Sequence, residues 1–161
     1  MSRIQDRLFQ GKAIVLLGPR QSGKTTLVKA VLEASDEKYL LLNADEPDVR
    51  ELLQEVTSTR LRTIIGDHRI VCIDEAQRVA NIGLTLKLLT DQIPEVQTIA
   101  TGSSSLDLNS SIAEPLTGRK FEFILHPLSF AELTSHHGLL AATTQVITPE
   151  TYDSFLTKTR H

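Results

Sequence analysis

Residues 18–25 read GPRQSGKT and follow the apolar run AIVLL at residues 13–17. They fit the pattern GxxxxGK[ST] at every fixed position. Successive backbone N–H groups of such a loop cradle phosphate, and the N-terminus of the helix that follows adds the positive end of its dipole. The sequence therefore predicts a phosphate-binding loop between a buried strand and a helix. The competing interpretation is a glycine-rich turn that precedes a lysine by chance.

Each side chain of this loop has an expected role. Lys24 would reach the β- and γ-phosphates of a bound nucleotide, and the Thr25 hydroxyl would bind Mg²⁺. Arg20 would contact phosphate or a neighbouring subunit, or simply face solvent. The predicted nucleotide-binding set is Gly18, Pro19, Arg20, Gln21, Ser22, Gly23, Lys24, Thr25 and Thr26.

The rest of the chain alternates between strand-like and helix-like segments. Strands are expected at residues 13–17, 39–43, 70–74, 96–101 and 121–125, and helices at 23–34, 46–57 and 82–93. The first three strands are almost continuously apolar, as expected of strands covered on both faces, whereas the fifth alternates and predicts an edge or half-exposed strand. Strands that alternate with helices predict βαβ units and a parallel sheet, which makes the fold class α/β.

The third apolar run ends in two carboxylates, Asp74 and Glu75. At the end of a strand beside a phosphate loop, Asp74 would orient Mg²⁺ through its water shell, and Glu75 would polarise the water that attacks the γ-phosphate. Without the loop, the same pair would equally predict carboxylates that cap the next helix.

Composition excludes several classes of protein. The chain has 161 residues, a formal net charge of −3 and a single cysteine, Cys72, so neither a disulfide framework nor a cysteine-based metal site can form within one chain. No apolar run reaches the roughly 18 residues of a membrane span. The mild acidity does not support nucleic-acid binding. We expect a soluble, cytoplasmic domain without a membrane partner.

Four segments together resemble the AAA+ superfamily of P-loop ATPases. They are GPRQSGKTTL at 18–27, IVCIDEAQ at 70–77, ATGSSS at 100–105 and LTGRKFEFILHPLSFAEL at 116–133. More narrowly, they are similar to predicted prokaryotic AAA+ ATPases that usually carry an uncharacterised C-terminal domain. The resemblance implies a three-layer P-loop NTPase fold with a five-stranded parallel sheet in the order 5-1-4-3-2. It also implies ATP and Mg²⁺ as cofactors and Mg²⁺-dependent ATP hydrolysis coupled to conformational change.

The same resemblance suggests further site residues. Thr101 and Ser103 follow the fourth strand, where such ATPases keep a polar sensor, although a hydroxyl-rich turn would look alike. Arg119 precedes the fifth strand, where many AAA+ proteins place an arginine finger that acts in trans within a homo-oligomer; the alternative is a surface arginine. Asn43 would hold Glu75 inactive, or would be an ordinary turn residue at the end of a strand.

Residues 1–127 are predicted to form the AAA+ type nucleotide-binding core. Residues 128–161 carry two helix-start signals and predict a short helical appendage, the start of a lid or linker of a longer protein. The alternative function is an ATP-dependent switch or scaffold that hydrolyses slowly or not at all. A GTPase is disfavoured because no Asn-Lys-x-Asp segment occurs, and a small-molecule kinase because no acceptor lid is identifiable. The client or effector is not encoded in these residues.

Overall fold

The computed structural model describes residues 2–103 and 115–127. Within them a single sheet contains β1 (Ala13–Leu17), β2 (Tyr39–Asn43), β3 (Ile70–Asp74), β4 (Gln97–Gly102) and β5 (Lys120–Ile124). All neighbouring strands are parallel and their order is β2-β3-β4-β1-β5. This order confirms the predicted sheet and places β1 between β4 and β5.

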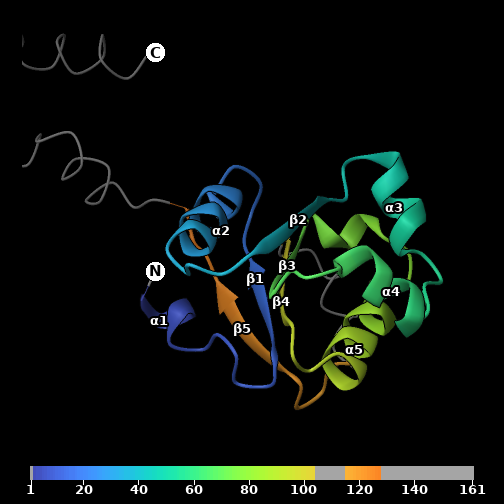
Figure 1. Ribbon diagram of the computed structural model, residues 1–161. Coiled ribbons are helices and arrows are strands. Elements are labelled where there is room, and N and C mark those ends of the chain that lie inside the picture. The colour runs from blue at the N-terminus through green and yellow to red at the C-terminus, as the bar shows by residue number, and fades with distance from the viewer. Residues whose placement is uncertain (1, 104–114, 128–161) are drawn as a thin grey trace, which may run out of the picture. The chain divides into compact units, whose positions relative to one another are not determined.

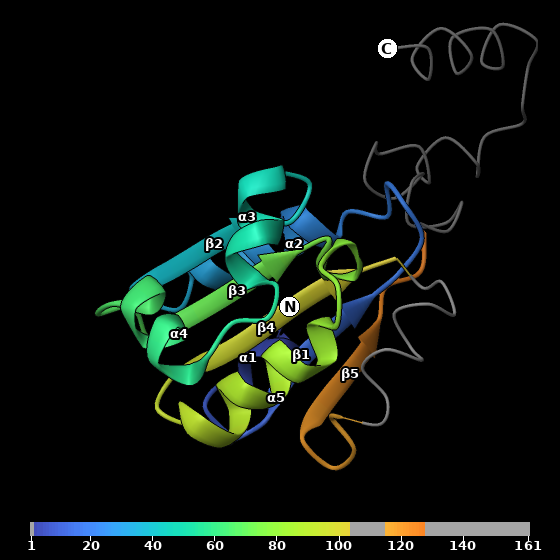
Figure 2. The ribbon, with the colours of Figure 1, turned by 90° about the vertical axis from the view of Figure 1, so that its right-hand side faces the viewer.

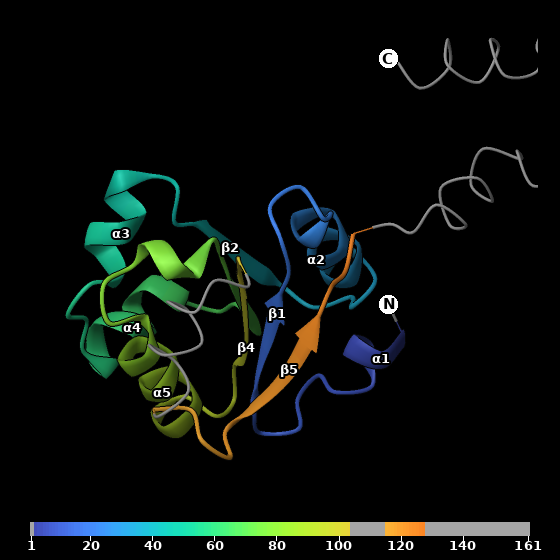
Figure 3. The same cartoon turned by 180° about the vertical axis from the view of Figure 1, so that it is seen from behind.

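Helices cover both faces of this sheet (Figure 1). On one side lie α1 (Ser2–Gln5) and α2 (Lys24–Glu33); on the other lie α3 (Pro47–Leu53), α4 (Ser58–Ile65) and α5 (Ile82–Gln92). The view from behind shows the same separation of α1 and α2 from α3, α4 and α5 (Figure 3). The described chain is therefore the predicted three-layer α/β fold.

Alternation along the strands divides the core in two. Val15 and Leu17 of β1 pack in the cluster shared with α3, α4 and α5, whereas Ile14 and Leu16 pack in the cluster shared with α1 and α2. Successive side chains of a strand point to opposite faces, so a strand covered on both sides must be apolar throughout. This explains the uninterrupted AIVLL run.

Parallel strands bring the candidate site together at one edge. The carboxyl ends of β1, β3 and β4 are adjacent, because Leu17 is level with Gly102 and Ile73 with Ala100. Figure 2 shows the strands from the face that carries α3, α4 and α5. Loops that follow these ends are the usual place for ligands in open α/β sheets.

Two local expectations were wrong. The predicted helix at 46–57 ends early, because only α3 lies within it and the chain turns at Glu55, whose φ is 51°. The helix α4 follows outside the predicted range and was not expected. It starts with its own cap, in which the Thr57 hydroxyl accepts from the Arg60 N–H. The second predicted strand is less buried than expected, although Leu40 and Leu42 pack against one cluster and Leu41 against the other. As an edge strand, β2 fully buries only Leu42, and Tyr39 is 40% exposed. The fifth strand is the other edge, as predicted.

The compact unit described here ends at Pro127. The predicted helical appendage at 128–161 lies outside the described residues and stays a prediction. Among the helices that the structure does describe, none is long and apolar enough to span a lipid bilayer.

Candidate functional site

The phosphate loop leaves β1 beside the ends of both neighbouring strands. The Gly18 N–H donates to the Gly102 carbonyl at 3.3 Å, and the Leu125 N–H donates to the Leu17 carbonyl at 2.7 Å. A Cβ placed on Gly18 would lie only 2.4 Å from the Leu125 carbonyl oxygen. Glycine is therefore required at position 18 because the segment after β5 passes directly against the loop.

The loop ends in a left-handed residue. Gly23 has φ 89° and caps α2, which begins at Lys24. Glycine adopts this conformation without the penalty that a Cβ imposes. The turn directs the first N–H groups of α2, which have no partner within the helix, toward the loop. Gly18 is buried whereas Pro19, Arg20, Gln21 and Thr26 are exposed.

Lys24 is buried, with only 4% of the residue exposed. Its Nζ donates to the carbonyls of Gly18 (3.1 Å) and Pro19 (2.9 Å), so the ammonium lies inside the curve of the loop. Ser22 contributes a buried hydroxyl with no hydrogen-bond partner among the described residues. A buried polar atom without a partner is costly, so the loop holds a cation and a hydroxyl suited to an anion.

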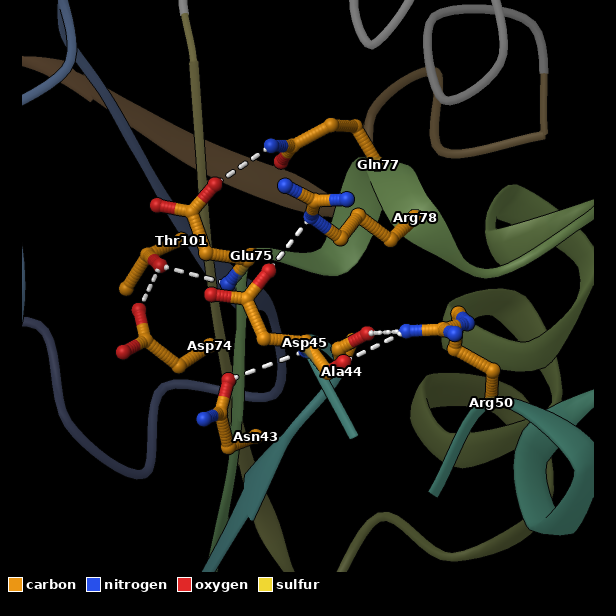
Figure 4. Close-up of polar contacts among 9 residues, drawn as sticks. All are labelled: Asn43, Ala44, Asp45, Arg50, Asp74, Glu75, Gln77, Arg78 and Thr101. Atoms are coloured by element: carbon orange, nitrogen blue, oxygen red, sulfur yellow. Dashed lines mark hydrogen bonds and ion pairs between the residues drawn. The ribbon is translucent and has the colours of Figure 1, made fainter. Parts of the chain in front are cut away.

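Asp74 connects the loop to β4. Its Oδ2 accepts from the Thr25 hydroxyl at 2.8 Å, and its Oδ1 accepts from the Thr101 hydroxyl. Asp74 is 7% exposed and Thr101 is fully buried. Three predicted site residues from α2, β3 and β4 are therefore joined in one hydrogen-bonded chain, part of which Figure 4 shows.

Glu75 lies next to this chain in an unusual backbone conformation. Its φ of 52° and ψ of 40° are left-handed, and it caps the short 3-10 helix η1 (Ala76–Arg78). The Glu75 N–H donates to the Thr101 hydroxyl at 3.2 Å. Its side-chain Oε2 accepts from the Gln77 amide at 2.6 Å (Figure 4).

Asn43 is at the end of β2 but does not hold Glu75. Its Oδ1 accepts from the Asp45 N–H at 3.0 Å, which is a local turn. The Asp45 carboxylate pairs with Arg78 of η1 (Figure 4). The structure therefore favours the turn interpretation of Asn43 over the switch.

Arg119 is far from the phosphate loop of its own chain. It directly precedes β5, whose first residue Lys120 is level with Ala13, at the opposite end of β1 from the loop. The four residue-to-residue steps along the five-residue strand β1 put roughly 13 Å between its two ends. The Arg119 Nε donates to Asp91 at 2.7 Å. Ser103, by contrast, follows β4 at the loop edge and is half-buried.

The donor set fits Mg²⁺ and a polyphosphate. Magnesium takes oxygen ligands, keeps several waters and needs only one or two protein carboxylates beside the phosphates. The Thr25 hydroxyl and the Asp74 carboxylate supply such oxygens at one point. The strand β3 behind them is buried along its whole length. Burial and the Asp74 charge raise the pKa of the Cys72 thiol, which is a core residue rather than a ligand.

Sequence reasoning missed the role of Gln77. The motif IVCIDEAQ contains it, but nothing in the pattern shows that a 3-10 turn folds this amide back onto Glu75. The left-handed Glu75 creates that turn, and a left-handed non-glycine residue is rarely detectable from sequence. The Asp45–Arg78 ion pair was also not foreseen.

Comparisons with known proteins agree with this fold. The sequence profile of the AAA domain family matches residues 10–134. An uncharacterized protein of Mycobacterium tuberculosis is 32% identical over 123 residues, which cover 73% of this chain and 26% of that protein. An uncharacterized AAA domain-containing protein of the same organism is 25% identical over 126 residues, covering 76% of this chain and 27% of its own length.

A solved structure has the same fold. The Walker-type ATPase of Pyrococcus abyssi superposes with a TM-score of 0.60 at 20% identity, and the match covers 92% of this chain and 59% of that one. The chain thus belongs to the AAA domain family and has a P-loop NTPase fold. It spans about a quarter of the length of the curated relatives described above.

Proposed function

We propose that this chain binds ATP together with Mg²⁺ in the loop at residues 18–26 and hydrolyses it. The observation that carries the proposal is the 2.8 Å hydrogen bond between the Thr25 hydroxyl and Asp74. It joins the first turn of the helix after the phosphate loop to the acidic end of β3. These are the two places from which a P-loop NTPase holds its metal ion.

Different residues at the loop contact the phosphates and the metal ion in this proposal. The N–H groups at the start of α2 and the Lys24 ammonium neutralise the β- and γ-phosphates. Lys24 exchanges its hydrogen bonds to the Gly18 and Pro19 carbonyls for phosphate oxygens. Thr25 and Asp74 would hold Mg²⁺, which supplies positive charge that screens the phosphate oxygens.

Hydrolysis is assigned to Glu75 and the hydroxyls at the end of β4. The Glu75 carboxylate accepts a proton from the attacking water, a contribution worth roughly 10²–10⁴ in rate. Thr101 fixes Asp74 and the Glu75 backbone at once, which suits a sensor of the γ-phosphate. Ser103 directly follows β4, two residues after Thr101, and is the second sensor candidate.

Oligomerisation would complete the site. We propose that Arg119 acts in trans on the nucleotide of a neighbouring copy, because it lies at the sheet edge opposite its own loop. A guanidinium that reaches transferring phosphate in this way contributes roughly 10³–10⁵ in rate. Turnover would then be coupled to a conformational change between copies. The free buried thiol of Cys72 fits the reducing cytoplasm, where we place the protein.

Calorimetric titration with Mg²⁺-ATP and with Mg²⁺-GTP tests nucleotide binding and its base preference. We expect binding of ATP, weaker binding of GTP, and loss of binding in Lys24→Ala. The matched control is Lys29→Ala, because Lys29 is an exposed lysine on the same helix. Equal ATP binding by Lys24→Ala and the wild type would refute the site. Tight ATP binding without any turnover would instead support the alternative function, an ATP-dependent switch or scaffold that does not hydrolyse ATP.

A further inference from the structure

Gln77 is a half-buried amide that contacts the residue assigned to water activation. It lies in the middle of η1, and its Nε2 donates to Glu75 Oε2 at 2.6 Å (Figure 4). A carboxylate only accepts hydrogen bonds, so the NH₂ end of this amide must face it. The contact spans two residues along the chain and exists because the left-handed Glu75 turns η1 back over its own carboxylate.

The backbone of Glu75 is already fixed without Gln77. Its N–H donates to the Thr101 hydroxyl at 3.2 Å, and its carbonyl accepts from the Arg78 N–H at 3.0 Å. These two backbone hydrogen bonds do not fix the direction of the long Glu75 side chain. Gln77 occupies one carboxylate oxygen and thereby sets the direction in which the other can accept.

The other end of the amide argues against a purely structural role. Gln77 Oε1 is buried and has no hydrogen-bond partner among the described residues. An unpaired buried acceptor is destabilising, and an apolar side chain of similar size would avoid it. A residue chosen for stability alone would therefore be leucine-like at this position. The contact that the glutamine does make is the one to Glu75.

We propose that Gln77 is a positioning residue that holds the Glu75 carboxylate toward the attacking water. This proposal rests on the proposed hydrolysis of ATP. Because the amide stays neutral, it donates to Glu75 without competing for the proton that the carboxylate must accept. Its hydrogen bond goes to Glu75 and not to Thr25 or Asp74, the residues proposed to hold Mg²⁺, so we expect it to affect turnover and to leave nucleotide binding unchanged.

Two substitutions in the full 161-residue chain test the proposal. Gln77→Leu removes the donor together with the unpaired acceptor. Gln77→Glu keeps the shape but replaces the donor by a second carboxylate. The matched control is Gln54→Leu, since Gln54 is an exposed glutamine at the end of α3. Steady-state kcat and KM, the Kd for Mg²⁺-ATP and the melting temperature are measured for each.

For Gln77→Leu we expect kcat to fall about tenfold while KM and Kd stay within about twofold of wild type. Its melting temperature should equal or exceed that of the wild type, because the unpaired acceptor is gone. Gln77→Glu should lose more activity than Gln77→Leu, because like charges then face each other. Wild-type kcat in Gln77→Leu would overturn the proposal. A joint fall of kcat, affinity and melting temperature would overturn it in favour of a structural role.

A double-mutant cycle separates this inference from the proposed function. In a Glu75→Gln background, Gln77→Leu should change kcat by less than about twofold, since Gln77 acts only through Glu75. A full additional loss in that background would contradict the positioning role while leaving ATP hydrolysis intact. A wild-type chain that binds but never hydrolyses ATP would refute the proposed function, and the positioning role with it.

Discussion

Thr101 offers the sharpest prediction about how the site holds itself together. Its hydroxyl donates to Asp74 Oδ1 and accepts from the Glu75 N–H, and the residue is fully buried. Thr101→Val keeps the shape of the side chain but removes both hydrogen bonds. Asp74 Oδ1 and the Glu75 N–H then lose the hydroxyl as their partner. Thr101→Ser keeps the hydroxyl and deletes one methyl group.

The magnitudes follow from these two bonds. A hydrogen bond to a charged group contributes about 1.5–3 kcal/mol and a neutral one about 0.5–1.5 kcal/mol, so Thr101→Val should lower the free energy of unfolding by about 2–4.5 kcal/mol. Thr101→Ser should lower it by about 1 kcal/mol, the cost of one buried methyl group.

Urea unfolding followed by circular dichroism measures both changes, and calorimetry with Mg²⁺-ATP measures binding by the same samples. Thr101→Val should also bind nucleotide more weakly than Thr101→Ser, because Asp74 loses its support from β4. If Thr101→Val were as stable as the wild type, or more stable than Thr101→Ser, the hydroxyl would not connect β3 to β4 as described.

Three further outcomes are expected. Gly18→Ala should lower the free energy of unfolding by about 1–3 kcal/mol, because the new Cβ meets the Leu125 carbonyl oxygen at 2.4 Å; unchanged stability in urea would show that this approach does not exist. Cys72 should resist iodoacetamide in the folded chain and react only as urea unfolds it, since it is fully buried; rapid native labelling would place it at the surface. Specific ATPase activity should rise with protein concentration and fall strongly in Arg119→Ala. Asp91→Ala, which removes the ion-pair partner of Arg119, should lower this activity less. Activity that is independent of concentration and survives Arg119→Ala would exclude the trans role.

The sequence predicts the architecture well because the signals are strong and redundant. A strand covered on both faces must be apolar along its buried length, and Ala13–Leu17 and residues 70–73 satisfy this without interruption. The GxxxxGK[ST] motif then predicts a strand before the loop and a helix after it, and the resemblance to AAA+ proteins implies the strand order. The approximate positions of five strands and three helices could be predicted in this way.

Local details depended on backbone angles that residue patterns do not reveal. Glu55 and Glu75 both adopt left-handed conformations without being glycine. The first lies just after the early end of the predicted helix at 46–57, and the second folds Gln77 onto the carboxylate. The role of Asn43 was open for a similar reason, since an amide at the end of a strand can serve either a turn or a neighbouring strand.

Some candidate site residues could be predicted from the sequence, but their hydrogen-bond partners could not. Thr25 and Asp74 could be named in advance from the phosphate-loop motif and from the acidic end of a strand beside it, and Thr101 from the resemblance to AAA+ ATPases. Their hydrogen-bond partners could not, since these depend on register, such as the pairing of Leu16 with Thr101. Arg119 was named from resemblance, and only the sheet shows that it lies at the opposite edge from its own loop.

Phosphate release from Mg²⁺-ATP in a single turnover, compared between the wild type and Glu75→Gln, tests ATP hydrolysis at this site most directly. We expect the wild type to release phosphate only when Mg²⁺ is present. Glu75→Gln should bind ATP with a Kd within about threefold of wild type, yet release phosphate at least about 100-fold more slowly. Equal release rates in the two proteins, or turnover that persists in excess chelator, would contradict the assignment of Glu75 and the metal site.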